Sequence, residues 1–306
     1  MRLANLAGRA VVITGGRDGA DPLLAADIGA ASDGAFGPTP ADVYAGWTEF
    51  SAWAASADGA ARLESAAGHT VTPAELSAPS PSPRQTFGIA LNYPAHAAEG
   101  HYDVPDFPGT FTKFATSLTG PHSTLELSGD TVDWEVELVV VIGATAKNVS
   151  AERAWEHVAG VTVGQDFSDR TVQKAGPAPQ FSLGKSFPGY GPTGPWLVTP
   201  DEVPGLGLQL TCEVNGRVVQ QASTDEMVFD PARLIEIISG ICTLFPGDLI
   251  FTGTPSGVAM AGNGPYLRHG DHVVSRIQSI GELHTDCVVR DTARHGDASV
   301  LATARA

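Results

Sequence analysis

The segment from Asp133 to Gly143, DWEVELVVVIG, constrains the fold of this chain more than any other. Successive side chains of a β-strand point to opposite faces of the sheet. On a strand, Glu135 and Glu137 therefore share one face, about 7 Å apart, and Val139 and Val141 follow them on it. The other face is apolar and consists of Trp134, Val136, Leu138, Val140 and Ile142. The pattern predicts a buried strand with two carboxylates at its N-terminal end.

Two carboxylates on a buried strand repel each other and are costly to desolvate, and a divalent cation between them removes both penalties. An edge strand whose glutamates face solvent is the alternative, and Glu-x-Glu alone does not decide between the two. Asp166 adds a third carboxylate at the end of the apolar run 160–165. Oxygen ligands without Cys or His favour Mg²⁺, Mn²⁺ or Ca²⁺ over zinc.

A proline-rich segment divides the chain. Residues 77–83 hold three prolines within five residues, which neither a helix nor a strand ladder accommodates. We therefore predict a linker at 77–84, between a small N-terminal domain at 1–76 and a larger domain at 85–292. A polar tail at 293–306 follows.

The two parts differ in their expected secondary structure. The first part has a strand at 9–13 and one or two helices over 41–61, with Val43, Trp47, Phe50 and Trp53 at helical spacing. The second is rich in short β-branched runs, which indicate a β-rich α+β fold. Its expected strands are 136–142, 160–163, 208–214, 248–252 and 272–277. Its expected helices are 94–99, 151–157 and 231–238.

Charge and composition exclude several classes of function. The 306 residues carry 18 Lys+Arg against 34 Asp+Glu, a formal charge of −16. This charge argues against nucleic acid and anionic membranes as partners. No apolar run approaches the ~20 residues of a membrane span, and residues 1–5 do not resemble a signal peptide. Three scattered cysteines without C-x-x-C fit a reduced, cytoplasmic protein.

A glycine cluster at residues 15–19, after the first expected strand, superficially resembles a dinucleotide-binding loop. Pro22 stands where the following helix should run, and Tyr-x-x-x-Lys is absent from the sequence. A hairpin-like turn is the favoured interpretation, and a nucleotide-dependent dehydrogenase is disfavoured.

An ordered series of short motifs runs from Phe87 to Leu283. It comprises N-Y-x-x-H-x-x-E at 92–99, F-T-K at 111–113, S-L-x-G-P at 117–121, E-x-E at 135–137, D-x-S-x-R-x-x-Q at 166–173, G-K-S-F at 184–187, G-P-W at 194–196, V-N-G at 214–216, P-G-D at 246–248 and T-G-T-P-x-G-V at 252–258. In this series the chain resembles the fumarylacetoacetate hydrolase family. The resemblance implies a mixed β-roll of that family's type, preceded by a small N-terminal α+β domain.

The resemblance also implies roles for individual residues. Glu135, Glu137 and Asp166 correspond to ligands of Mg²⁺ or Mn²⁺. His96 and Glu99 correspond to a pair that activates water, and one helical turn would place them side by side. Lys185 corresponds to a further catalytic group. The substrate-binding positions are Tyr93, Arg170, Gln173 and Thr254. A homodimer that acts on a small keto acid is implied as well.

The implied reaction is metal-dependent hydrolysis of a carbon–carbon bond in an acylpyruvate-like 1,3-diketo acid. An oxaloacetate-type decarboxylase or a hydroxymuconate isomerase or hydratase would use the same enolate chemistry, so the alternatives stay open. A catalytically silent metal-binding protein would leave the His96–Glu99 pair unexplained.

The chain departs from the family pattern at Pro188, at His122, where a glycine is common, and at residues 280–284, which include His284. We expect these positions near the far end of the substrate. We also expect the site centre, with a cation, Lys185 and Arg170, to be strongly cationic.

Overall fold

The computed structural model describes residues 1–16, 22–203 and 205–289. The fold is α+β and rich in strands, as predicted from the sequence. Its large mixed sheet has the strand order β4 (Ala67–Val71), β3 (Leu23–Asp27), β2 (Arg9–Thr14), β1 (Arg2–Leu6), β14 (Gly191–Val198), β12 (Val158–Gln165), β11 (Val136–Ile142), β17 (Leu249–Phe251), β6 (Thr86–Ala90) and β7 (Gly109–Thr112). Short β5 (Leu76–Ser77) pairs with β1, and β8 (Leu118–Thr119) pairs with β14.

A second, smaller sheet packs against the first. Its strand order is β16 (Arg217–Ser223), β15 (Gln209–Val214), β18 (His272–Ile277), β19 (Gly281–Val289) and β9 (His122–Leu127). A separate pair joins β10 (Val132–Asp133) to β13 (Ser168–Asp169).

Most helices are short. The α-helices are α1 (Ile28–Ala31), α2 (Pro40–Ala45), α3 (Trp47–Ala55), α4 (Ala57–Ala66), α5 (Pro94–Glu99), α6 (Arg170–Gln173), α7 (Phe181–Gly184) and α8 (Pro231–Ser239). The 3-10 turns are η1 (Pro73–Glu75), η2 (Ala115–Ser117), η3 (Ala151–His157), η4 (Pro200–Glu202), η5 (Thr224–Glu226) and η6 (Ala259–Ala261).

The helical stretch expected over 41–61 is divided among three helices. Gly46 ends α2, and the Ser56 side chain caps α4 by accepting a hydrogen bond from the backbone amide of Gly59. The predicted helix 94–99 has the predicted bounds, whereas 151–157 forms a 3-10 turn.

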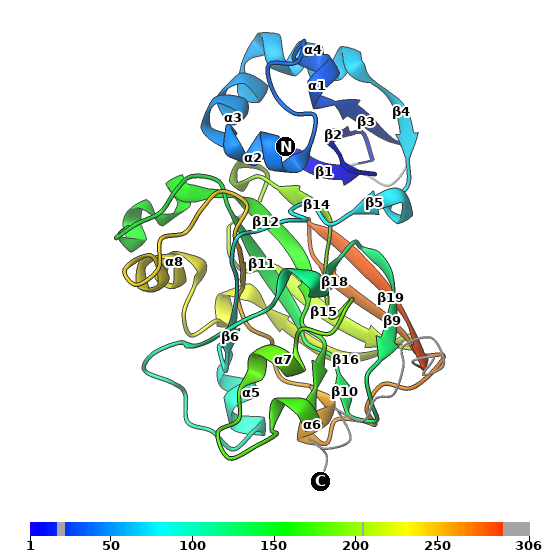
Figure 1. Cartoon of the computed structure of the whole chain (residues 1–306), viewed down its shortest axis with the longest axis vertical. Coiled ribbons are helices and arrows are strands. Elements are labelled where there is room, and N and C mark those ends of the chain that lie inside the picture. Colours follow the sequence, from blue (N-terminus) through cyan, green and yellow to red (C-terminus); the bar gives the residue numbers. More distant parts are fainter. Residues whose placement is uncertain (17–21, 204, 290–306) are drawn as a thin grey trace.

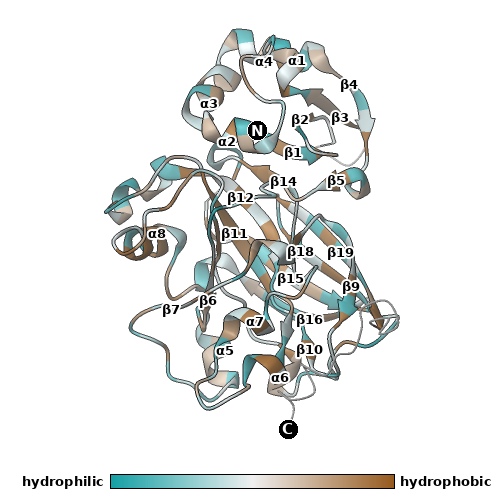
Figure 2. Cartoon of the chain, in the orientation of Figure 1, coloured by the Kyte–Doolittle hydropathy of each residue, from teal (hydrophilic) through white to brown (hydrophobic). Residues whose placement is uncertain are grey.

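Strand β11 lies inside the large sheet, with β12 on one side and β17 on the other, both antiparallel. The edge-strand alternative for Glu135 and Glu137 is therefore wrong. Figure 2 shows hydrophobic residues along β11 and β12. Both faces of β11 are buried, which explains why Val139 and Val141 interrupt a simple alternation of polar and apolar residues.

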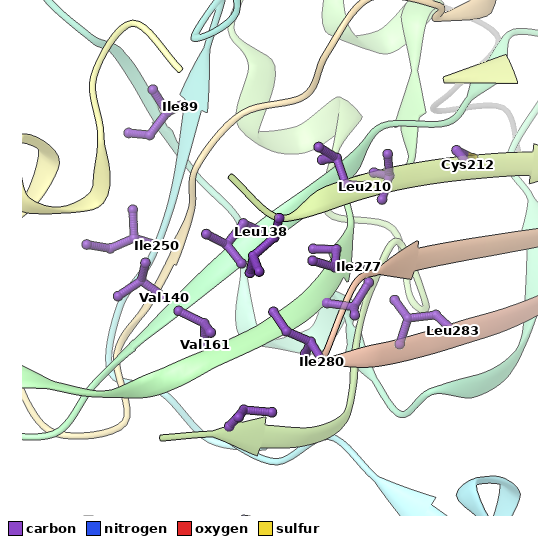
Figure 3. Packing of buried hydrophobic residues seen from close by; sticks show 14 of the residues in the cluster. Ile89, Leu138, Val140, Val161, Leu210, Cys212, Ile250, Ile277, Ile280 and Leu283 are labelled. Atoms are coloured by element: carbon purple, nitrogen blue, oxygen red, sulfur yellow. The ribbon is translucent and has the colours of Figure 1, made fainter. Parts of the chain in front are cut away.

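The two faces of β11 belong to different cores. Leu138 and Val140 lie in the core between the two sheets, together with Leu210, Ile277 and Leu283 (Figure 3). The opposite face packs under the N-terminal helices, where the core includes Val139, Val141, Val43, Trp47 and Phe50. The predicted stripe of α2 and α3 thus covers the large sheet.

Residues 1–76 extend the large sheet, because β1 pairs with β14 through Arg2↔Val198 and Leu3↔Leu197. They form the upper part of the molecule in Figure 1. Residues 78–85 belong to neither helix nor strand, and the domain division at 77–84 stays a prediction.

Strand β2 pairs antiparallel with β3, so the glycine cluster leads into a second strand and not into a phosphate-binding helix. Residues 17–21 of that turn and the predicted tail at 293–306 lie outside the described residues. Across the described ranges, no helix is long and apolar enough to cross a membrane.

Candidate active site

A cavity of about 500 Å³ opens beside α5, α6 and α7. These helices lie in the half of the molecule away from the N-terminal strands (Figure 1). Its polar wall is formed by His96, Glu135, Arg170, Gln173, Lys185 and Thr254. Its apolar wall includes Ile89, Phe111, Phe181 and Met260. The volume and the mixed lining are typical of a site for a small organic ligand.

Three carboxylates converge at the polar wall, and Glu135 is the one that lines the cavity. The antiparallel register Val136↔Gln165 places the start of β11 next to the end of β12. The Asp166 amide donates to the Glu135 carbonyl oxygen over 2.9 Å, which brings Asp166 beside Glu135 and Glu137. One carboxylate oxygen from each residue lies within 4.8 Å of the other two, and all three residues are buried.

Two buried lysines neutralise part of this charge. Lys185 Nζ donates to Glu135 Oε2 over 2.6 Å and to Asp166 Oδ2 over 2.8 Å. Lys113 Nζ donates to Asp166 Oδ1 over 2.6 Å and to the carbonyl oxygens of Lys185 and Tyr190. The charges of Asp166 and Glu135 raise the pKa of Lys185 although burial lowers it, whereas burial outweighs Asp166 and lowers the pKa of Lys113.

Arg170 lines the cavity and pairs with two carboxylates. Its Nη2 lies 2.8 Å from Asp133 Oδ2 and 2.7 Å from Glu135 Oε1. Its Nη1 donates to Gln173 Oε1 over 3.0 Å, so one turn of α6 holds both side chains. The predicted substrate-binding residues Arg170 and Gln173 are thus brought together at the cavity wall.

Glu137 has fewer hydrogen-bond partners than the other two carboxylates of the group. Its Oε2 accepts a hydrogen bond from the Gly253 amide over 2.7 Å, but its buried Oε1 has no hydrogen-bond partner in the described part of the chain. Burial, and then the charges of Asp166 and Glu135, raise the pKa of Glu137 well above its usual range. Burial also raises the pKa of Glu135, but the positive charges of Lys185 and Arg170 outweigh it and lower that pKa.

These residues fit a divalent cation. The unpartnered Glu137 oxygen points to a missing positive partner, because a buried carboxylate oxygen without one is costly. Within the described ranges, no second group of three converging His, Cys, Asp or Glu side chains is found. An all-oxygen set suits Mg²⁺ or Mn²⁺, as predicted.

His96 and Glu99 form a hydrogen-bonded pair on α5. His96 Nδ1 lies 2.7 Å from Glu99 Oε1, and Glu99 Oε2 accepts from Gly257 N and Asn263 Nδ2, each over 2.9 Å. An ionised carboxylate only accepts, so His96 Nδ1 carries the hydrogen and Nε2 remains a proton acceptor. His96 lines the cavity, so the unprotonated Nε2 of its ring can accept a proton there.

The other sequence-predicted residues lie at different depths. Thr254 lines the cavity, and its hydroxyl donates to the Val136 carbonyl oxygen over 3.0 Å. Tyr93 is only 1% exposed and does not line the cavity. Its predicted contact with substrate therefore has no geometric support.

The three departures from the family pattern do not lie at the far end of the cavity. Pro188 borders a different depression, near Thr124 and Ser128. His122 and His284 lie together on the second sheet, with ring centroids 4.7 Å apart. None of the three lines the cavity, so the geometry does not support the expectation: Pro188 lies in a turn, and the two histidines lie on strands of the second sheet.

The sequence analysis assigned no role to two residues that the structure places in the site. Asp133 accepts hydrogen bonds from Arg170 Nε and from the amides of Ala259 and Met260. It precedes Glu135 by two, so strand alternation could have found it. Lys113 is buried beside Asp166, and its place in the F-T-K motif was the available signal.

The site is also less cationic than expected. Lys113, Arg170 and Lys185 are opposed by Asp133, Glu135, Glu137 and Asp166, so these side chains sum to about −1 in their ionised forms. One divalent cation reverses the sign to about +1. The carboxylates balance the positive charge of the basic side chains, so a bound cation would be needed for the cavity to attract an anion.

Comparison with known proteins agrees with this geometry. Residues 85–288 match the profile of the fumarylacetoacetate (FAA) hydrolase C-terminal domain. Oxaloacetate tautomerase FAHD2A, mitochondrial, from Bos taurus is 42% identical over 210 residues, which cover 67% of each chain.

Two solved structures extend the likeness. A protein from Mycobacterium smegmatis, provisionally named HpcE, superposes with a TM-score of 0.86 at 44% identity, covering 95% of this chain and all of that one. Maleylpyruvate hydrolase from Sphingobium sp. SYK-6, crystallised with manganese(II) and pyruvate, has a TM-score of 0.75 at 28% identity, with 94% and 99% coverage. These relatives include a hydrolase and a tautomerase. The chain belongs to the fumarylacetoacetate hydrolase family.

Proposed function

We propose that the protein is a metal-dependent enzyme that hydrolyses a carbon–carbon bond in an acylpyruvate-like 1,3-diketo acid. One observation carries the proposal: His96, with its tautomer set by Glu99, lines the same cavity as Glu135 and Lys185. A base and an anion-stabilising centre at one cavity are what hydrolysis of a diketo acid requires.

Glu135, Glu137 and Asp166 would hold the cation. When bound, Mg²⁺ or Mn²⁺ supplies Lewis acidity to the oxygens of an α-keto acid. The partnerless Oε1 of Glu137 supports its role as a ligand.

His96 Nε2 would take a proton from the water that attacks the distal carbonyl carbon. The bond from that carbon to the methylene carbon would then break, releasing the acid, and the enolate that leaves would take up a proton from His96 to give pyruvate. Glu99 keeps the ring oriented and stabilises its protonated form, since the carboxylate is held by Gly257 and Asn263. Lys185 and Arg170 line the cavity and would stabilise negative charge that develops on the substrate, and Gln173 would hold Arg170 in place through their hydrogen bond.

The apolar part of the cavity favours a substrate with an acyl arm. The rings of Phe111 and Phe181 lie 5.7 Å apart, and Lys185 Nζ lies 5.0 Å from the Phe111 ring centroid. The aromatic wall therefore begins next to the charged end. A four-carbon dicarboxylate would occupy the polar end and leave the apolar half unfilled.

Oxaloacetate tautomerisation is a second candidate, favoured by the 42% identity to the bovine oxaloacetate tautomerase. In that reaction His96 would move a proton between carbon and the enol oxygen, and no water would attack. Decarboxylation and isomerisation of a hydroxymuconate remain further alternatives that use the same base and carboxylates.

A substrate panel followed by proton NMR separates these reactions. With Mg²⁺ present, we expect cleavage of acetylpyruvate and fumarylpyruvate to pyruvate and an acid, and no cleavage of a neutral 1,3-diketone. Faster keto–enol exchange of oxaloacetate without cleavage of any acylpyruvate would contradict the hydrolase assignment and support the tautomerase. Equal turnover of the neutral diketone would contradict carboxylate recognition.

The predicted homodimer and cytoplasmic location belong to the proposal as well. Light scattering that gives only the monomer mass at micromolar concentration would refute the dimer.

A further inference from the structure

Three histidines that take no part in the cavity gather on the outer face of the second sheet. His122 lies on β9, His284 on β19 and His272 on β18, and these strands are neighbours. The ring of His122 stacks on His284 at 4.7 Å between centroids, and the ring of His272 lies 5.5 Å from His284. The residues that alternate with them, Val273 and Leu283, are buried, so the imidazoles point to the solvent side.

Each of two imidazoles is tied to a carboxylate. His272 Nδ1 lies 2.7 Å from Asp286 Oδ1, and His284 Nε2 lies 2.9 Å from Glu282 Oε1. Ionised carboxylates only accept, so the hydrogens sit on His272 Nδ1 and on His284 Nε2.

The remaining nitrogens face each other. His284 Nδ1 and His272 Nε2 are 3.3 Å apart. In two neutral rings with these tautomers, both atoms present a lone pair, and neither has a hydrogen to donate. Such a contact is repulsive unless a cation or an extra proton lies between the two atoms.

We propose that His272 and His284 form a binding site for a borderline divalent cation such as Zn²⁺. Zinc–nitrogen bonds of about 2.0–2.1 Å at a tetrahedral angle place two ligand nitrogens about 3.3 Å apart, which matches the observed separation. Asp286 and Glu282 act as the outer partners that fix the tautomer of a metal-bound histidine. Asp286 and Glu282 carry two negative charges against the one positive charge of Arg276, so the surroundings of the histidine pair are net negative and favour a cation.

This site differs from the carboxylate site in chemistry and in place. Imidazole nitrogens select zinc, copper or nickel, whereas three carboxylates select magnesium or manganese. The side chains of His272 and His284 are 41% and 27% exposed, so water can fill the open coordination positions. The cation would bridge β18 and β19 and stabilise the folded chain, with no contact to the cavity.

Calorimetric titration with ZnCl₂ tests the proposal, with saturating Mg²⁺ present to occupy the carboxylate site. We expect one zinc per chain in the wild type and loss of that binding in His272→Gln and in His284→Gln. Glutamine stays close in size and polarity at these partly exposed positions, and circular dichroism checks each fold. The matched control is His269→Gln, an exposed histidine outside the pair, which should bind zinc as the wild type does.

Two further measurements locate the ligands. Asp286→Asn should weaken zinc binding about 10–100-fold, as expected for an outer partner of a ligand. Nitrogen-15 NMR should show zinc-induced shifts at His272 Nε2 and His284 Nδ1. Absence of zinc binding to the wild type would overturn the site and assign the facing nitrogens to a shared proton. Zinc binding that survives in both glutamine variants would also overturn it.

Discussion

The carboxylate site and the histidine pair hold similar numbers of ionisable groups on the same β-framework, but in opposite surroundings. Glu137, Asp166 and Lys113 are at most 3% exposed. The side chains of His272 and His284 are a quarter to two-fifths exposed, so water can replace a lost partner there. We therefore expect burial, more than residue type, to decide how much each charged partner contributes to the free energy of unfolding.

The two regions therefore should respond differently to the same kind of substitution. Removing one member of a buried ion pair leaves an uncompensated charge and costs about 3–5 kcal/mol. Removing one member of an exposed pair costs about 0–1 kcal/mol. The predictions below begin with the largest expected effect.

His96→Ala should lower turnover by about 10²–10⁴-fold with a smaller change in KM, because a general base acts in the transition state. Steady-state kinetics on acetylpyruvate measures both constants. His269→Ala, at an exposed histidine that does not line the cavity, should leave both unchanged. Full activity of His96→Ala would remove the water-activating role and favour decarboxylation.

Lys113→Met should lower the free energy of unfolding by about 3 kcal/mol, since Asp166 loses a buried partner and keeps only Lys185. Urea unfolding of the wild type and the variant measures the difference. Lys147→Met, at an exposed lysine, is the matched control and should stay within about 0.5 kcal/mol. A loss below about 1 kcal/mol for Lys113→Met would mean that the burial contrast is wrong.

Mn²⁺ should stabilise the protein more at pH 8 than at pH 5.5. The pKa of Glu137 is raised in the folded chain, so its contribution to stability is full below the unfolded value near 4.5 and is lost as pH rises through the folded value. A bound cation favours the ionised form and removes that loss. At a hundredfold excess over Kd the gain is about 2.7 kcal/mol.

Thermal unfolding with EDTA or with Mn²⁺ at both pH values checks this expectation. Equal stability in EDTA at the two pH values would contradict a raised pKa for Glu137. Glu282→Gln, on the outer sheet, serves as the comparison and should keep the manganese effect.

Arg276→Ala should change the free energy of unfolding by about 1 kcal/mol or less. Its guanidinium pairs with Glu282 and Glu213 at the surface, where its side chain is half exposed. Urea unfolding in low and high salt measures the change. A loss close to that of Lys113→Met would erase the contrast between the two regions.

The local pattern around β11 predicted much of the site. Alternation placed Glu135 and Glu137 on one face, and the end of the next strand supplied Asp166, because antiparallel neighbours bring a strand's end beside the other's start. The family motifs then supplied His96, Arg170 and Lys185 as candidates, and all of them line the cavity.

Other features depend on contacts between distant segments. Lys113 reaches Asp166 only because β7 and the segment after α7 meet at the site. The pairing of β1 with β14 and the meeting of His272 with His284 likewise follow from tertiary packing. Strand spacing gives the face of each residue relative to its own strand and does not name the neighbouring strand.

A crystal structure with Mn²⁺ and oxalate, a mimic of a pyruvate enolate, is the most direct test of the metal site. Anomalous scattering should place one manganese within about 2.2 Å of oxygens from Glu135, Glu137 and Asp166, with oxalate completing its coordination. His96 should then face the open side of the oxalate. Manganese more than about 3 Å from these three carboxylates would contradict the central assignment.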